Sequence, residues 1–211
     1  MLYTNDITKK IAVGNMFIGG CSLDTHLLNA KTNKGAYDFR TNSNGTWSTK
    51  GGTSIRTAVM SENWDFITFQ QVSGYSGVAD SYASLTELIE IVKPLCPDAT
   101  LAWHMTWESY TGTKTYEEIV AATEKYILPM EDIDIIVPTG TAIQNVWNSG
   151  LADNIVFRNK HLSYGLGRYV ESLTLFKALT GYSIDNIVAP TRDTEGNSAT
   201  TGYDSAKPSF V

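Results

Sequence analysis

The sequence has few cysteines, a deficit of basic residues and no long apolar run. Cys21 and Cys96 are the only cysteines, which excludes a disulfide framework and leaves at most one bridge, for which the sequence offers no support. The 16 basic residues are outnumbered by 22 acidic ones, for a net charge of −6. Nucleic acids and anionic membrane surfaces both need a basic protein surface, so neither is an expected partner.

Targeting and cofactor signals are also missing. No apolar run reaches membrane-spanning length, and the N-terminal MLYTNDITKK lacks the apolar stretch of a signal peptide. We therefore expect no membrane partner and a cytoplasmic location, with export only if a further segment precedes the printed sequence. There is no G-x-G-x-x-G at a strand–helix turn, no phosphate-binding loop and no zinc-type histidine spacing, so neither a cofactor nor a metal is expected.

The length, the composition and the hydrophobic pattern of the sequence indicate one globular domain. The chain has 211 residues with 42% hydrophobic and 18% charged residues, enough to bury a sizeable core. Apolar runs over 64–71, 99–105 and 133–138 predict buried strands, and helical patterns separate them. This alternation favours an α/β fold, a flavodoxin-like three-layer α/β/α sandwich with a mostly parallel sheet. We assign 1–189 to this domain and 190–211 to a polar tail.

Local signals place the remaining elements. Two short strands around Gly45 predict a hairpin, and Thr53 to Met60 is predicted to be a helix. The patterns Ser84–Glu87 and Thr115–Glu118 predict capping boxes that open two helices. A last helix follows Leu162 and ends at Gly181; its predicted apolar stripe consists of Leu166, Tyr169, Val170, Leu173 and Phe176.

The segment Ile11 to His26 reads as a strand, a tight turn and a helix start. Gly19 and Gly20 allow positive φ or a close approach to a ligand, and the N–H groups of the next helix turn can receive negative charge. In an open α/β sheet, ligands bind where the carboxyl ends of the strands meet the amino ends of the helices, as in this strand–turn–helix segment. Ser22 follows the turn and has two interpretations: an N-cap that accepts a backbone N–H, or a nucleophile.

The histidines and two amides are further candidates. His161 lies between an irregular loop and a helix, which suits a general base that titrates near neutrality. His26 lies one helical turn after Ser22 and is expected at the pocket rim or on the surface. His104, at a strand end, either lines a pocket or is half-buried with a backbone partner. Gln70 and Gln71 end the strand 64–71 and precede a long Gly-, Ser- and Tyr-rich loop.

Four stretches together resemble the SGNH/GDSL hydrolase superfamily, and specifically a bacterial branch of esterases or acetylhydrolases. They are the GGCSL turn, WDFITFQQVS, PTGTAIQN and HLSYGLGRY, and the resemblance extends from about Ile11 to Gly181. It implies a three-layer α/β/α fold and serine-dependent hydrolysis of esters, often acetyl groups on carbohydrates. It also implies that His161 is the base, that Gly20 contributes an oxyanion-hole N–H, and that Gln70 or Gln71 replaces the usual asparagine.

The sequence departs from that branch in two places. In members of that branch, a first strand ends in Gly-Asn-Ser-Phe, and a second strand has a sequence similar to GNMFIGGCSLDTH. The printed sequence begins near this second strand. If Ile11 to Ile18 corresponds to the second strand, the nucleophile lies outside these residues. If it corresponds to the first strand, Gly20 to Leu23 is the GDSL-like turn and Ser22 attacks. The three residues before His161 include no carboxylate, which leaves Asp153 as an acid that could reach it. An orienting carboxylate is worth about four orders of magnitude in serine proteases.

The resulting prediction is an ester hydrolase that acts on a carbohydrate or small-molecule ester, in which Ser22 attacks, His161 takes its proton, and Gly20 with Gln71 holds the oxyanion. One alternative is a non-catalytic carbohydrate-binding protein of the same fold, with a platform formed by Trp103, Trp107, Tyr75 and the two glutamines. Another is a shortened gene product that lacks a central strand. The sequence makes no prediction of oligomeric state.

Overall fold

The computed structural model describes residues 11–43, 45–108, 114–150, 155–157, 161–163 and 166–185. Asp153, the three residues before His161 and the tail 190–211 lie outside these ranges. The elements in chain order are β1 (Ala12–Phe17), α1 (Leu23–Lys31), β2 (Tyr37–Ser43), β3 (Thr46–Thr53), α2 (Ile55–Val59), β4 (Phe66–Phe69), the 3₁₀ helix η2 (Ala79–Tyr82), α3 (Ser84–Val92), the 3₁₀ helix η3 (Lys93–Leu95), β5 (Thr100–His104), α4 (Tyr116–Tyr126), β6 (Ile135–Val137), α5 (Thr139–Asn148), β7 (Val156–Phe157), β8 (His161–Leu162) and α6 (Leu166–Thr180).

The described strands form three sheets. β4, β5 and β6 are parallel in that order, which confirms the three strands predicted from their apolar runs. β5 is buried over most of its length, whereas β4 and β6 are mostly half-buried. β1, β2 and β3 form an antiparallel sheet, and β7 pairs with β8. The predicted hairpin is therefore confirmed, with Gly45 at a φ of 88° in its turn. The chain is a mixed α/β protein.

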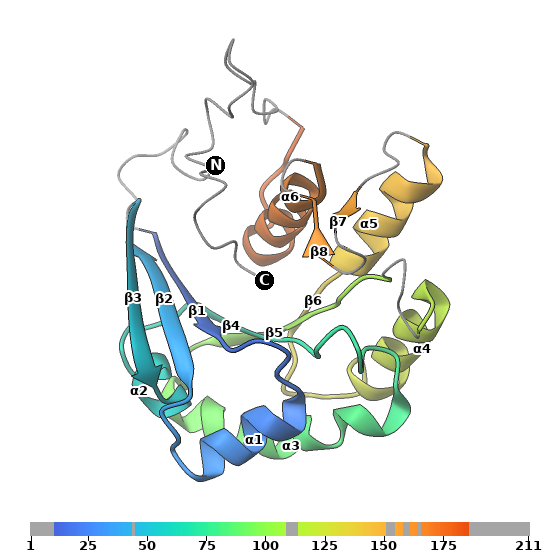
Figure 1. Cartoon of the computed structure of the whole chain (residues 1–211). Helices are drawn as coiled ribbons and strands as arrows, with labels where there is room; N and C mark the ends of the chain where they lie inside the picture. Colours follow the sequence, from blue (N-terminus) through green and yellow to red (C-terminus); the bar gives the residue numbers. More distant parts are fainter. Residues whose placement is uncertain are drawn as a thin grey trace.

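Helices lie on both sides of the parallel sheet (Figure 1). α1, α2 and α3 lie on one side, and α5 and α6 lie on the other. The main core fills the space between the sheet and α1 to α4, with Leu23, Leu85, Leu101 and Trp103 almost wholly buried. A smaller core of Trp107, Ile143, Ile155, Val156 and Leu162 joins α5 to β7 and β8.

Three local predictions need correction. The strand before Gly19 exists, but β1 pairs antiparallel with β2 and not with the parallel sheet of the described residues. The Ser84 capping box does not form, because Ala83 is the N-cap of α3 and the Ser84 hydroxyl donates to Asp24 on α1. By contrast, the box at Thr115 is confirmed, with both reciprocal bonds to Glu118 present.

The third correction concerns α6. The helix exists and Gly181, at a φ of 70°, ends it as predicted. Its buried residues are Gly167 and Glu171, whereas Leu166 of the predicted stripe is 40% exposed. The predicted stripe is therefore correct in part: Val170 packs against the smaller core, but the most buried positions of α6 carry a glycine and a carboxyl group.

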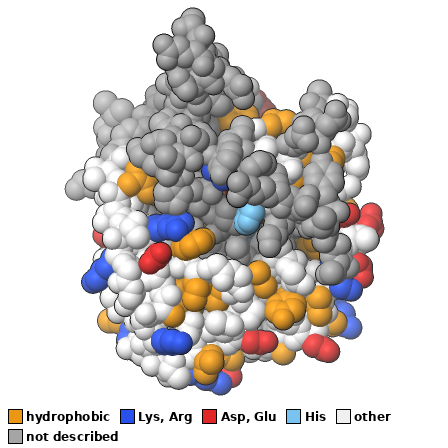
Figure 2. Space-filling model, in the orientation of Figure 1, with side chains coloured by type: hydrophobic (Ala, Val, Ile, Leu, Met, Phe, Trp, Pro, Cys, Tyr) orange, Lys and Arg blue, Asp and Glu red, His pale blue; other side chains and the backbone are white. Residues whose placement is uncertain are grey.

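Charged residues are mixed on the face shown in Figure 2, where described Lys and Arg side chains are interspersed with Asp and Glu. No continuous basic surface is visible among the described residues of this face. Within the described ranges, no helix is both long enough and apolar enough to cross a membrane.

Candidate functional site

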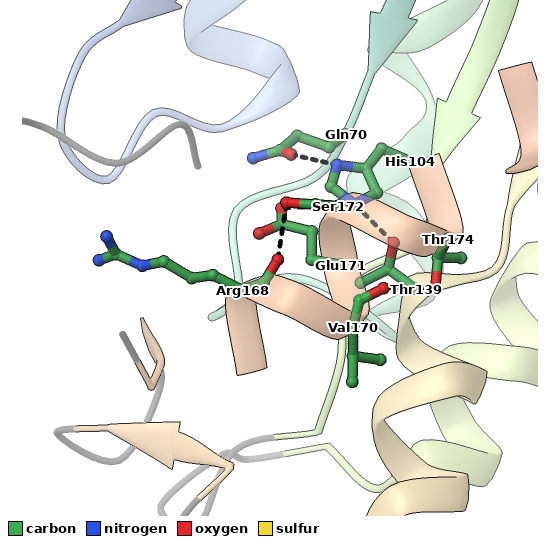
Figure 3. A network of polar contacts seen from close by, with 8 residues as sticks. All are labelled: Gln70, His104, Thr139, Arg168, Val170, Glu171, Ser172 and Thr174. Atoms are coloured by element: carbon green, nitrogen blue, oxygen red, sulfur yellow. Dashed lines mark hydrogen bonds and ion pairs between the residues drawn. The ribbon is translucent and has the colours of Figure 1, made fainter. Parts of the chain in front are cut away.

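Polar side chains gather where the parallel strands end. Gln70 and Gln71 follow β4, and His104 is the last residue of β5. Thr139 begins α5 and is separated from the end of β6 by one residue. Because carboxyl ends of parallel strands share one edge, these groups come together there, and α6 adds Glu171 (Figure 3). This polar cluster of Gln70, His104, Thr139 and Glu171 is the candidate site.

His104 is the centre of the cluster. Its side chain is buried, with Nδ1 3.1 Å from the Gln70 side-chain oxygen and Nε2 2.9 Å from the Thr139 hydroxyl. An amide oxygen only accepts, so Nδ1 carries the hydrogen and Nε2 accepts the Thr139 O–H. Burial lowers the pKa of His104 to about 4, which keeps this imidazole neutral at pH 7.

Glu171 faces the same imidazole from α6. One carboxyl oxygen lies 3.9 Å from His104 Nε2, and the residue is 6% exposed. Burial raises the pKa of Glu171 to about 8, although the nearby Arg168 charge opposes this rise. His104 and Glu171 are therefore both uncharged near neutral pH. Their contact is not an ion pair, although the two atoms lie within ion-pair distance.

Two glycines in the recognised motifs permit this packing. A Cβ on Gly140, in PTGTAIQN, would lie 2.1 Å from the Thr106 carbonyl oxygen, so α5 reaches the end of β5 only because this residue is glycine. A Cβ on Gly167, in HLSYGLGRY, would lie 2.3 Å from the Ile155 carbonyl oxygen. The Ser163 hydroxyl accepts the Gly167 N–H at 3.0 Å and so anchors the start of α6.

Gln71 connects the end of β4 to the start of α1. Its side-chain oxygen accepts the backbone N–H groups of Leu23, at 3.2 Å, and of Val72, at 2.8 Å. Its amide N–H donates to the Ser81 carbonyl at 2.7 Å, and the residue is 1% exposed. Gln71 thus holds the Ser22 turn against the sheet edge with bonds that already engage its oxygen and one amide hydrogen.

Ser22 is the N-cap of α1. Its hydroxyl accepts the Thr25 N–H at 3.3 Å and lies 3.2 Å from the Thr25 hydroxyl. Within the described residues, both hydrogen-bond contacts of this hydroxyl are to Thr25. Gly20, with a φ of 65°, is exposed two residues before it, and nothing lies within 4 Å of where its Cβ would be.

The other two histidines occupy different settings. His161 lies in β8 with an exposed side chain and pairs through its backbone with Phe157 of β7. His26 is half-buried, stacks on Tyr37 with 5.6 Å between ring centroids, and its Nδ1 lies 2.8 Å from the Tyr37 hydroxyl. Burial lowers the pKa of His26 to about 4, so His26 is a structural partner of Tyr37.

The predicted aromatic platform is not formed. Trp103 is 2% exposed and Trp107 is 5% exposed, and each belongs to one of the two cores. Tyr75 is exposed. Two shallow hollows of about 220 Å³ each lie beside Tyr126 on α4, and none of the predicted site residues lines them.

The structure therefore groups Gln70 with His104, and Gln71 with the Ser22 turn. Sequence reasoning missed Thr139 and Glu171. Thr139 directly follows the apolar run that predicts β6, which is a usable signal for a site residue in a parallel sheet. The signal for Glu171 was that it is the one acidic residue of the helix Leu166–Thr180. The described residues contain no cluster of three or more His, Cys, Asp or Glu placed to hold a metal.

The chain belongs to the family described as Domain of unknown function (DUF4886), whose model matches residues 2–201. It is similar to a solved protein from Bacteroides uniformis ATCC 8492, described as a DUF4886 family protein. The two chains are 36% identical with a TM-score of 0.76, over 84% of this chain and 77% of the other. No curated protein matches the chain.

Proposed function

We propose that this protein is an SGNH-type ester hydrolase with a three-layer α/β/α fold, acting on a carbohydrate or small-molecule acyl ester. One observation carries the proposal: Gln71 fastens the α1 turn that bears Ser22 to the same strand end at which Gln70 contacts His104. A serine at a helix N-terminus, free backbone N–H groups and a side-chain amide are the parts that acyl transfer needs.

In this proposal, the Ser22 hydroxyl oxygen attacks the ester carbonyl carbon and His161 accepts the hydroxyl proton. The Gly20 N–H and the Gln70 amide stabilise the oxyanion, and the proton then passes from His161 to the departing alcohol. Water, deprotonated by the same histidine, attacks the acyl-enzyme, and the acid product leaves as Ser22 regains its proton. The neutral His104 fixes the orientation of Gln70 throughout.

Labelling with a fluorophosphonate probe, followed by peptide mapping, tests the nucleophile directly. We expect an adduct on Ser22 that is absent from Ser22→Ala and strongly reduced in His161→Ala. Ser54→Ala is the matched control, because Ser54 caps α2 through the same two contacts, to the N–H and hydroxyl of Thr57. An adduct on another serine, or none in folded protein, contradicts the assignment of Ser22.

A second function has one observation in its favour. The Ser22 hydroxyl makes the same cap contacts as Ser54, which has no site role, so Ser22 also fits a protein that binds an acylated sugar without cleaving it. This version predicts saccharide binding in calorimetry that Ser22→Ala leaves unchanged, together with no turnover of p-nitrophenyl acetate.

A further inference from the structure

The candidate site contains two polar groups that the proposed mechanism leaves partly or wholly unused. Glu171 is 6% exposed, and among the described residues its carboxyl group makes no hydrogen bond; its one polar contact is His104 Nε2 at 3.9 Å. The Gln70 amide nitrogen likewise has no hydrogen-bond partner in the described part of the chain, although its oxygen is held by His104. Neither the Glu171 carboxyl oxygens nor the Gln70 amide nitrogen is among the fully buried unpaired atoms of the described residues, so both groups are open to a partner supplied by a ligand or by solvent.

The two groups flank the same imidazole and point to the same side of it. In Figure 3 the Gln70 amide nitrogen and the Glu171 carboxyl group are directed away from Thr139. In the observed orientation the Gln70 side-chain oxygen faces His104 Nδ1, so the amide nitrogen is the atom directed to this side. Gln70 therefore presents N–H, a donor, to whatever occupies this side.

The surroundings of Glu171 favour its neutral form. His104 on β5 is uncharged at neutral pH, and α5, which packs on α6, carries no charged residue. β6 contributes only isoleucine and valine. Arg168, one turn earlier on α6, is the one described charge that acts on this carboxyl group, and burial outweighs it. A protonated carboxyl group is a hydrogen-bond donor, whereas a carboxylate only accepts.

We propose that Gln70 and Glu171, the latter as a neutral carboxylic acid, together bind the carbonyl oxygen of an uncharged acyl group. The site would then select acetyl-type esters and amides and reject ligands that present a donor at this point. As a statement about the substrate, this inference rests on the proposed hydrolase function. As a statement about carbonyl binding, it is testable without turnover.

The first test is calorimetric titration with N-acetylglucosamine, whose amide carbonyl replaces that of an acetyl ester but resists hydrolysis. We expect wild-type protein to bind it at pH 6.5 and to lose affinity as the pH passes about 8. Glu171→Gln keeps a hydrogen-bond donor that cannot ionise, so this variant is expected to bind the sugar both at pH 6.5 and above pH 8. Glu171→Met removes the donor and is expected to weaken binding about fivefold or more, the usual value of one hydrogen bond.

Glu124→Gln is the control for loss of a carboxyl group, since Glu124 is exposed on α4, and it should bind as wild type does. Infrared difference spectra of wild type against Glu171→Gln at pH 6.5 should show one protonated carboxyl band. If Glu171→Met does not fold, the pH profile of Glu171→Gln and this infrared band still test whether neutral Glu171 binds the carbonyl oxygen. The inference is overturned if wild type does not bind the sugar, if binding is independent of pH, or if the band is absent.

Turnover of p-nitrophenyl acetate separates this inference from the hydrolase proposal. Binding that follows the pattern above in a protein without esterase activity retains the carbonyl site and rejects the hydrolase. Esterase activity whose KM and kcat are both unchanged in folded Glu171→Met retains the hydrolase and rejects the carbonyl site.

Discussion

The side-chain oxygen of Gln71 accepts a hydrogen bond from the backbone N–H of Leu23, 48 positions earlier in the chain. This bond satisfies one of the free N–H groups in the first turn of α1, which the Ser22 cap does not reach. It also fixes the position of the Ser22 turn relative to β4. The placement of a helix start at the sheet edge thus depends on one buried amide.

Replacing Gln71 with methionine should therefore destabilise the fold. The change leaves the Leu23 N–H, the Val72 N–H and the Ser81 carbonyl without their partner. We expect a loss of about 3 kcal/mol in the free energy of unfolding, because each buried group left unpaired costs about 1–3 kcal/mol. Urea denaturation measures it. Gln144→Met, which removes an exposed bond to Asn148, is the control and should change stability by less than about 0.5 kcal/mol.

Gly140 gives a second prediction, on packing. Gly140→Ala places a methyl group against the Thr106 carbonyl, a backbone atom that cannot swing away, so we expect a loss of about 3 kcal/mol. Gly19→Ala is the matched control, because nothing lies within 4 Å of its Cβ position. Thermal unfolding of the two variants compares them; equal melting temperatures would contradict the close approach of α5 to β5.

Three buried groups give a pH dependence of stability. Burial lowers the pKa of His104 and of His26 from 6.5 to about 4, so each adds stability above pH 6.5 that is lost as the pH falls toward 4. Burial raises the pKa of Glu171 from 4.5 to about 8, so its contribution is complete below pH 4.5 and is lost as the pH rises to about 8.

Between pH 4.5 and 6.5 the two histidines outweigh the one carboxyl group, and above pH 6.5 the carboxyl group outweighs the histidines. From these groups, stability should rise to about pH 6.5 and then fall toward pH 8 with a slope of at most about 0.8 kcal/mol per pH unit, because the histidines still oppose part of the effect. Glu171→Gln should abolish the alkaline fall and make the rise between pH 4.5 and 6.5 steeper, because the two histidines are then unopposed. Urea midpoints from pH 4 to 9 measure both limbs, and an alkaline fall that survives in the variant excludes Glu171 as its cause.

Much of the fold could be predicted from local sequence signals, because those signals act over a few residues. The apolar runs identified β4, β5 and β6, and Thr115 with Glu118 identified the start of α4. The failures came from distant partners. The hydroxyl of Ser84 bonds to Asp24 on another helix and so does not cap its own. Likewise, nothing near β1 in the sequence indicates that it pairs with β2 rather than with the parallel sheet.

The candidate site was only partly predictable for the same reason. Amides and a histidine at strand ends are visible in the sequence, and the structure brings Gln70 and His104 together. Glu171 comes from a helix 67 positions beyond His104, and its burial depends on how α6 packs on α5 and β6. The roles of Ser22, His161 and Gly20 remain predictions, and Trp103 and Trp107 are core residues instead of a ligand platform.

The most direct test of the central claim is the hydrolysis of p-nitrophenyl acetate by wild type, Ser22→Ala and Ser54→Ala. Both variants lose an equivalent helix cap, at a cost of about 1 kcal/mol each, so they are matched in stability. We predict that Ser54→Ala keeps the wild-type rate and that Ser22→Ala loses at least about a thousandfold in kcat/KM. Equal rates in the two variants would show that Ser22 is a helix cap and nothing more.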